Sequence, residues 1–95
     1  MENNEQYYII RTDRAGVFFA QIAERRGDEA DLRNARRIHY WSGATECLGI
    51  ATNGVGHGSR ITVSVTEMTV LGVIEIHPAT EKATECLKNF ASWIA

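Results

Sequence analysis

The stretch from Arg33 to Ala44, RNARRIHYWSGA, concentrates side chains that could bind an anion: three arginines, a histidine, a tyrosine and a tryptophan. Arginine forks bind phosphate or carboxylate through two hydrogen bonds, and a tryptophan ring offers a stacking surface for a base or a guanidinium. The same residue types are favoured anchors at protein interfaces. A third interpretation is a solvated basic face, whose arginines pair with the acidic residues Glu24, Asp28, Glu29 or Asp31.

A second arginine-rich segment, RTDRAG, precedes this stretch. Arg11 and Arg14 flank Asp13 in a turn, where Asp13 can bond to nearby backbone and Gly16 can adopt a positive φ. Such a turn could close over an anion, or it could simply expose its arginines to solvent. The candidate ligand-binding residues are therefore Arg11, Arg14, Arg36, Arg37, His39 and Trp41.

Motifs for catalysis or metal binding do not emerge from the spacing. The three histidines form no HExxH, and Cys47 and Cys86 belong to no CxxC pair. The glycine-rich loop GVGHG precedes a strand and lacks the lysine of a phosphate-binding loop. Glu75 is the best candidate for a buried carboxylate, with a structural ion pair as its alternative. We assign no catalytic residue, metal or cofactor, and the motifs favour a protein that is not an enzyme.

The bulk composition indicates a single folded domain spanning residues 1–95, with residues 1–5 as a flexible lead. A net charge of −2 gives no global positive field, so non-specific nucleic-acid binding is not expected. The polar start is unlike a signal peptide, and the apolar runs are too short to cross a membrane. Since a domain this small is marginally stable alone, we expect a homo-oligomer.

Alternation and turn residues predict most of the secondary structure. Strands are expected over residues 7–12, 60–66 and 70–77, the last of them central in the sheet. A helix following Ser42 as N-cap would bury Ala44, Cys47, Leu48 and Ala51. A last helix, capped by Thr80, would bury Ala83, Leu87, Phe90, Ala91 and Ile94. Residues 17–24 and 30–41 fit either a strand or a helix, with a turn at Gly27 between them.

Three groups of residues resemble a family of small bacteriophage and prophage proteins with no assigned activity. They are Arg11-Thr12 with Ala15–Phe18, Asn34–Arg37 with Tyr40–Ala44, and Val73–Ile76 with Pro78 and Thr80–Ala83. The resemblance favours strands over residues 17–41, as a hairpin that turns at Gly27. It implies an α+β domain, with an antiparallel sheet of about five strands in the order β-β-β-α-β-β-α and two helices on one face. Leu32, Ile38 and Tyr40 would then face the core, and Arg33, Arg37, His39 and Trp41 the opposite side.

The resemblance also implies a setting in the cytoplasm of a bacterial host. We expect a non-enzymatic binding protein that antagonises host defence, in its sharper form an oligomer that sequesters a nucleotide-like anionic signal with Arg11, Arg36, Arg37 and Trp41. A protein inhibitor of a host defence nuclease, of the anti-CRISPR type, is the first alternative. A small nucleotide-processing enzyme using Glu75 or a histidine as base is the second.

Overall fold

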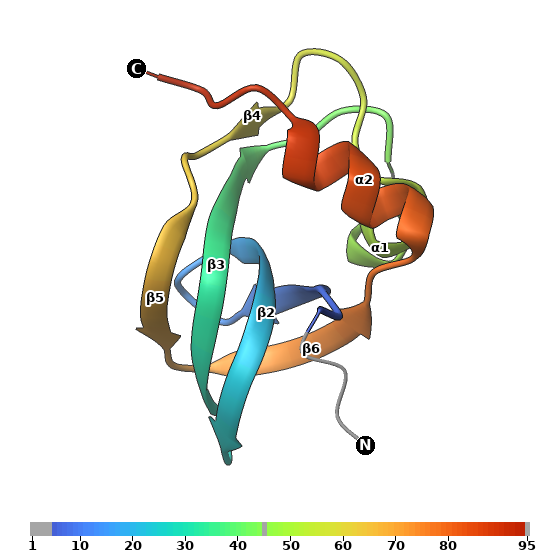
Figure 1. Cartoon of the computed structure of the whole chain (residues 1–95). Helices are drawn as coiled ribbons and strands as arrows, with labels where there is room; N and C mark the ends of the chain where they lie inside the picture. Colours follow the sequence, from blue (N-terminus) through green and yellow to red (C-terminus); the bar gives the residue numbers. More distant parts are fainter. Residues whose placement is uncertain (1–4, 45, 95) are drawn as a thin grey trace.

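A computed structural model describes residues 5–44 and 46–94, so most of the lead expected at residues 1–5 lies outside the described residues. The elements follow the chain as three strands, a helix, three further strands and a helix (Figure 1). They are β1 (Tyr8–Thr12), β2 (Val17–Arg26), β3 (Glu29–Tyr40), α1 (Cys47–Asn53), β4 (Arg60–Ile61), β5 (Val65–Val70), β6 (Val73–Pro78) and α2 (Glu81–Asn89). The predicted α+β class and the strand hairpin over residues 17–41 are confirmed.

All pairings between the strands are antiparallel, in the order β4-β3-β2-β1-β6, and β5 also pairs with β3. Strands β5 and β6 therefore lie at opposite edges although only Leu71 and Gly72 separate them. This corner is possible because the sheet curls: Gly72 has a φ of 74° and its carbonyl accepts a hydrogen bond from the Asp13 amide at 2.7 Å. The predicted continuous strand over residues 70–77 is thus wrong at this corner, and β6 is an edge strand rather than a central one.

The curled sheet buries side chains on both faces. Its concave face holds an inner core, and both helices cover the other face over a helix-side core (Figure 1). The fully buried members of the inner core include Ile10, Phe18, Ala20 and Leu32. Those of the helix-side core include Ile9, Phe19, Ile50, Ile61 and Leu87. Because neighbouring strand residues point to opposite faces, Ile9 and Ile10 serve the two cores in turn.

A bulge divides β3 into two halves. Gln21 pairs with Arg33 and Phe19 with Arg36, so β3 carries one residue more than β2 between these pairs. Asn34 has a φ of 51° at this point. The extra residue shifts the alternation of side chains. As a result Leu32 joins the inner core whereas Ile38 joins the helix-side core, and the prediction that they share a face is wrong.

The edge beside β3 is also irregular. Ile61 pairs with Ile38 and Val65 with Ala35, which leaves an extra residue on the edge strand between the two pairs. The chain leaves the ladder at Thr62, whose amide donates to the Arg37 carbonyl at 3.0 Å and whose hydroxyl accepts from the Arg37 amide at 2.9 Å. The expected strand over residues 60–66 is therefore broken, and Val63 is exposed.

The helix boundaries differ from the prediction at the start of α1 and at the end of α2, which stops at Asn89 instead of continuing to Ile94. Thr80 caps α2 as expected, since its hydroxyl accepts a hydrogen bond from the Ala83 amide at 3.1 Å. Ser42 does not cap α1, which begins after Glu46. Its hydroxyl instead donates to the His57 carbonyl and joins two loops. Three residues expected on buried helical stripes, Leu48, Ala91 and Ile94, are exposed.

Candidate anion-binding face

The six predicted site residues do not form one cluster. Arg14 and Arg37 line one open hollow, whereas Arg11 and Trp41 line a different, smaller one. His39 stacks on Trp93, and Arg36 is buried. Within one chain, therefore, Arg11, Arg36, Arg37 and Trp41 are not brought together as a single clamp.

Arg36 has a structural role. It is only 6% exposed, and its guanidinium donates to the Thr62 carbonyl at 2.8 Å and to the Leu87 carbonyl at 2.6 Å. Leu87 lies in the last turn of α2, where backbone carbonyls lack helical partners. The third contact of Arg36, to the Ser92 hydroxyl, fixes the segment that follows the helix. Burial lowers the pKa of Arg36, but the group remains charged because arginine is so strongly basic.

Arg37, the next residue, is exposed and faces the other way. Its guanidinium carbon lies 5.0 Å from the centre of the Phe18 ring, in a cation–π arrangement. Its backbone is held by both hydrogen bonds to Thr62. The hollow beside it has a volume of 660 Å³ and is lined by Asp13, Arg14, Ala15, Arg37 and the β5–β6 corner from Met68 to Gly72. A guanidinium and an apolar wall thus border the same open space.

Arg14 reaches this hollow from the β1–β2 turn. Thr12, rather than the expected Asp13, shapes the turn: its hydroxyl donates to the Gly16 carbonyl and accepts from the Ala15 amide, each at 2.8 Å. Arg14 itself is almost fully exposed, and its only described ion pair is a long contact of 3.9 Å to Asp13. An exposed pair of this kind holds its partners weakly, so Arg14 can turn toward a ligand in the hollow.

His39 begins a stacked group that sequence patterns did not reveal. Its ring lies 4.7 Å from the Trp93 ring with an angle of 11° between the planes. The Arg60 guanidinium lies 5.5 Å from the centre of the same Trp93 ring and 6.0 Å from that of Tyr40. Trp93 is brought here by its amide, which donates to the Ile61 carbonyl at 2.8 Å. Arg60 begins the predicted strand over residues 60–66, whereas Trp93 falls within the predicted last helix, which in the structure ends at Asn89. The position of Trp93 beside His39 therefore had no signal in the sequence.

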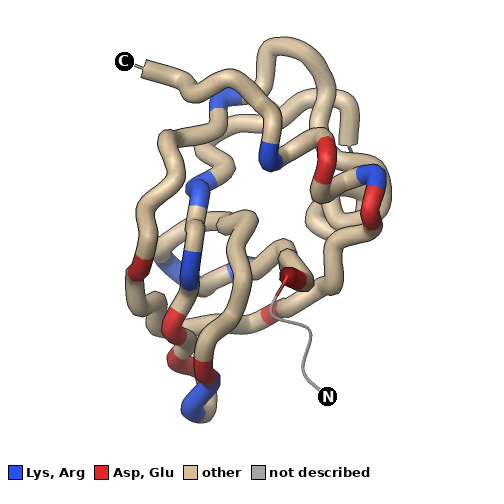
Figure 2. The backbone as a smooth tube through the Cα atoms, viewed as in Figure 1, with Lys and Arg blue, Asp and Glu red and all other residues tan. Residues whose placement is uncertain are grey.

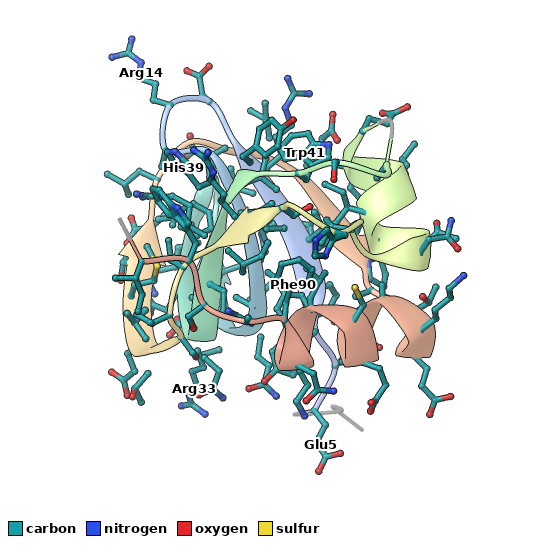
Figure 3. All side chains as sticks on the ribbon, turned by 90° about the horizontal axis from the view of Figure 1, so that it is seen from above. Glu5, Arg14, Arg33, His39, Trp41 and Phe90 are labelled. Carbon is teal, nitrogen blue, oxygen red and sulfur yellow. The ribbon has the colours of Figure 1, made fainter. Side chains whose placement is uncertain are left out.

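We define the arginine face as Arg14, Arg37, His39, Arg60 and Trp93. Arg37 and His39 lie two residues apart on β3 and point to the same side, and Arg14 and His39 lie on one side of the sheet in Figure 3. Arg33 lies on the opposite side (Figure 3), so the expectation that it shares a face with Arg37 and His39 is wrong. The bulge at Asn34 is the physical reason.

The charges of the arginine face are poorly compensated. Among the described residues, none of the carboxylates lies within salt-bridge distance of Arg37 or Arg60. The carboxylates expected to neutralise this region instead surround Arg26 at the hairpin tip, where Figure 2 shows acidic and basic positions intermixed. The arginine face can therefore offer an anion two guanidinium groups, each of which lies over an aromatic ring. Neither group must first break an ion pair.

Arg11 and Trp41 belong to the helix side of the sheet. Arg11 pairs with Glu75 at 3.2 Å, and the other oxygen of Glu75 lies 2.8 Å from Nε2 of His77. Glu75 is partly exposed, so the buried carboxylate expected there is absent and the alternative of an ion pair holds. The hydrogen bond from His77, followed by the charge of Arg11, lowers the pKa of Glu75. A carboxyl with a lowered pKa is a poor general base at neutral pH.

Cys47 lines the same small hollow, which has a volume of 210 Å³. Burial raises the pKa of its thiol, so it is a weak nucleophile. Neither Cys47 nor Cys86 is in a disulfide. In the part of the chain that the structure describes, histidine, cysteine and acidic residues form no group of three or more that could hold a metal ion. None of the described helices is long and apolar enough to span a membrane.

Comparison with known proteins gives a family but no activity. No curated protein and no solved structure matches the chain. One family model, described as a domain of unknown function (DUF6948), matches residues 5–87, which include every strand and most of α2. Trp93 lies beyond the matched residues, whereas the four other members of the arginine face lie within them. On this evidence the chain belongs to the DUF6948 family.

Proposed function

We propose that this protein is a non-enzymatic binding protein whose arginine face captures an anionic, nucleotide-like ligand. The observation that carries the proposal is the placement of Arg37 and Arg60 over aromatic rings, without a described carboxylate in salt-bridge distance. Guanidinium groups recognise phosphate, and exposed aromatic rings accept a stacked base. The apolar wall of the neighbouring hollow adds a surface for the flat part of such a ligand.

The resemblance to phage proteins supplies the biological setting of the proposal. A binding protein that removes a signalling nucleotide from the host cytoplasm would antagonise host defence without catalysis. Capture by an oligomer would suit this role, since several sites would then be held in one particle. The phage origin and the host are part of the proposal, and the chemistry of the arginine face is its physical support.

Isothermal titration calorimetry against cyclic oligonucleotides and ADP-ribose derivatives tests the capture of a ligand. We expect heat with at least one of these compounds. Each of the changes Arg37→Gln and Arg60→Gln should then weaken binding about tenfold or more, the loss of a charge-assisted hydrogen bond. Arg33→Gln is the matched control: it removes the same charge on the other side of the sheet and should leave affinity within about twofold, because it lies beyond direct reach of the ligand.

A fluorescence titration locates the ligand independently of the arginines. The chain contains two tryptophans, so Trp41→Phe leaves Trp93 as the only one. A ligand that stacks in the His39–Trp93–Arg60 group should change the emission of this variant. The absence of heat with every compound of the panel would overturn the proposed function. Binding that Arg33→Gln weakens as much as Arg37→Gln would show that the ligand uses another surface.

A second candidate function is the inhibition of a host defence nuclease by direct contact. The observation in its favour is Leu71, which is 65% exposed at the corner between β5 and β6 and lines the hollow with Arg14 and Arg37. Exposed apolar side chains beside arginines are typical of protein interfaces. This function predicts a stable complex on size-exclusion chromatography, which Leu71→Asp disrupts, and no heat with any nucleotide.

A further inference from the structure

Three strands form the edges of the sheet, and two of them are protected. The segment after α2 covers β4: Ser92 forms a parallel bridge with Ile61, and the Trp93 amide donates to the Ile61 carbonyl. Strand β6 ends in Pro78 and carries Glu75 and His77, and proline and charge are features that discourage further strand pairing.

Strand β5 is not covered by another described segment, and it contains no proline. Its sequence, VTEMTV, contains four β-branched residues, two on each side of Glu67 and Met68, and it lacks lysine, proline and glycine. Apart from its ladder with β3, Val65–Val70 takes part in none of the other backbone hydrogen bonds found among the described residues. Nothing lies beyond β5 on its outer side in Figure 1. Such an edge is a template for another strand.

We propose that the β5 edge binds the β5 edge of a second copy of this chain, antiparallel, to form a two-fold dimer. A two-fold axis at Met68 would place Met68 opposite Met68, Glu67 opposite Thr69 and Thr66 opposite Val70. Glu67 is the only charged residue of β5, so this register sets no like charges directly opposite each other. Arg33, a residue of opposite charge, is its register partner on β3.

Exposed apolar residues at this edge favour a second copy of this chain as the partner, because the copy would present the same apolar residues. Val63 and Val65 are 55% and 43% exposed, and both border a hollow of 330 Å³ beside Arg37 and Met68. A second β5 would cover part of this surface in addition to forming backbone hydrogen bonds. The contact does not depend on the proposed ligand, although it would bring the arginine faces of two copies into one particle.

Light scattering of the full chain over a dilution series tests the dimer. We expect a mass of twice 10.6 kDa at high concentration, falling toward the monomer on dilution. Thr66→Lys should give the monomer mass throughout, because a charged edge residue opposes strand pairing. Val65→Lys, at a second exposed position, should do the same. Ile74→Lys is the control, since it places the same charge at an exposed apolar position of the other edge strand, β6, and should leave the dimer intact.

The proposal would be overturned by either of two kinds of result. One is a wild-type mass of 10.6 kDa at every concentration. The other is a dimer that survives both β5 substitutions, or that Ile74→Lys disrupts equally, because the copies would then meet elsewhere. Circular dichroism checks that each variant is folded. Calorimetry on Thr66→Lys separates this proposal from the proposed function: loss of the dimer with the ligand heat retained supports the β5 contact alone.

Discussion

At the hairpin tip, Arg26 lies among three carboxylates, those of Glu24, Glu29 and Asp31. At the other end of β3, Arg37 lies over a phenylalanine ring, and Arg60 on the neighbouring strand lies over two other rings. The tip neutralises its own charge, so it has little left to attract an anion. The far end keeps its positive charge available. Arginines in two segments can therefore differ in their capacity to bind an anion, and the distribution of the acidic residues decides which of them remain available.

At the far end, two neighbouring arginines differ in their exposure to solvent: Arg36 is buried, whereas Arg37 is exposed. Arg36 has exchanged water for three oxygen acceptors on the opposite side of the sheet from Arg37. Only Arg37 can meet a ligand without unfolding part of the protein. The contrast between the tip, Arg36 and Arg37 leads to three predictions, which are given in order of decreasing effect on the stability of the fold.

Arg36→Met should have the largest effect on stability. It leaves the carbonyls of Thr62 and Leu87 without their donor and removes the contact to Ser92. We expect a loss of about 3 kcal/mol in the free energy of unfolding, measured by urea denaturation and circular dichroism. Arg26→Met is the control from the tip and should cost much less, because its ion pairs are exposed. Equal losses would contradict the structural role of Arg36.

Asn34→Val should have an intermediate effect. Asn34 has a positive φ at the bulge that turns Arg33 and Arg37 to opposite sides, and a β-branched residue is strained in that region. We expect a loss of about 1–2 kcal/mol in the same urea measurement. Asn34→Gly, which accepts the positive φ freely, should stay within about 0.5 kcal/mol although it also loses the hydrogen bond to Gln21. If valine is tolerated as well as glycine, the bulge does not depend on this backbone conformation.

A lower pH should have the smallest effect on stability, and this effect should come from the hairpin tip. Hydrogen bonds from Arg26 and then Thr69 lower the pKa of Asp31 to about 2, whereas an unfolded aspartate titrates near pH 4. The stabilisation from the ionised form is therefore complete above about pH 4 and is lost as the pH falls toward 2. Melting temperatures between these values should fall less steeply in Arg26→Gln than in the wild type. Arg25→Gln, which loses only a bond to the Gly27 carbonyl, should retain the wild-type slope.

The tip illustrates what the sequence predicts well. Gly27 lies between two long alternating segments, and the structure places it at the turn with a φ of 61°. Thr80 likewise caps α2 as its position indicates. In both cases the deciding interactions lie within a few residues along the chain, so local residue types are sufficient.

The far end could not be predicted in the same way. Its decisive features are the bulge at Asn34, the burial of Arg36 against Leu87, and the arrival of Trp93 beside His39 and Arg60. Each depends on contacts between segments that are distant in sequence. A single extra residue in β3 reverses the side-chain alternation beyond it, so the correct recognition of a strand still gave the wrong face for Arg33 and Ile38.

The hydrogen bonds of Arg36 also constrain the order of events during biosynthesis. Its acceptors at Leu87 and Ser92 lie 51 and 56 residues further along the chain. When the β2–β3 hairpin first leaves the ribosome, this cation still has no native partner and must remain hydrated. The hairpin can close early through its local turn, but its helix-facing side can become dry only after α2 has been synthesised. Completion of this fold therefore waits until α2 has been synthesised, and the hairpin formed before then still has exposed apolar surface, a feature that makes incomplete folds prone to aggregation.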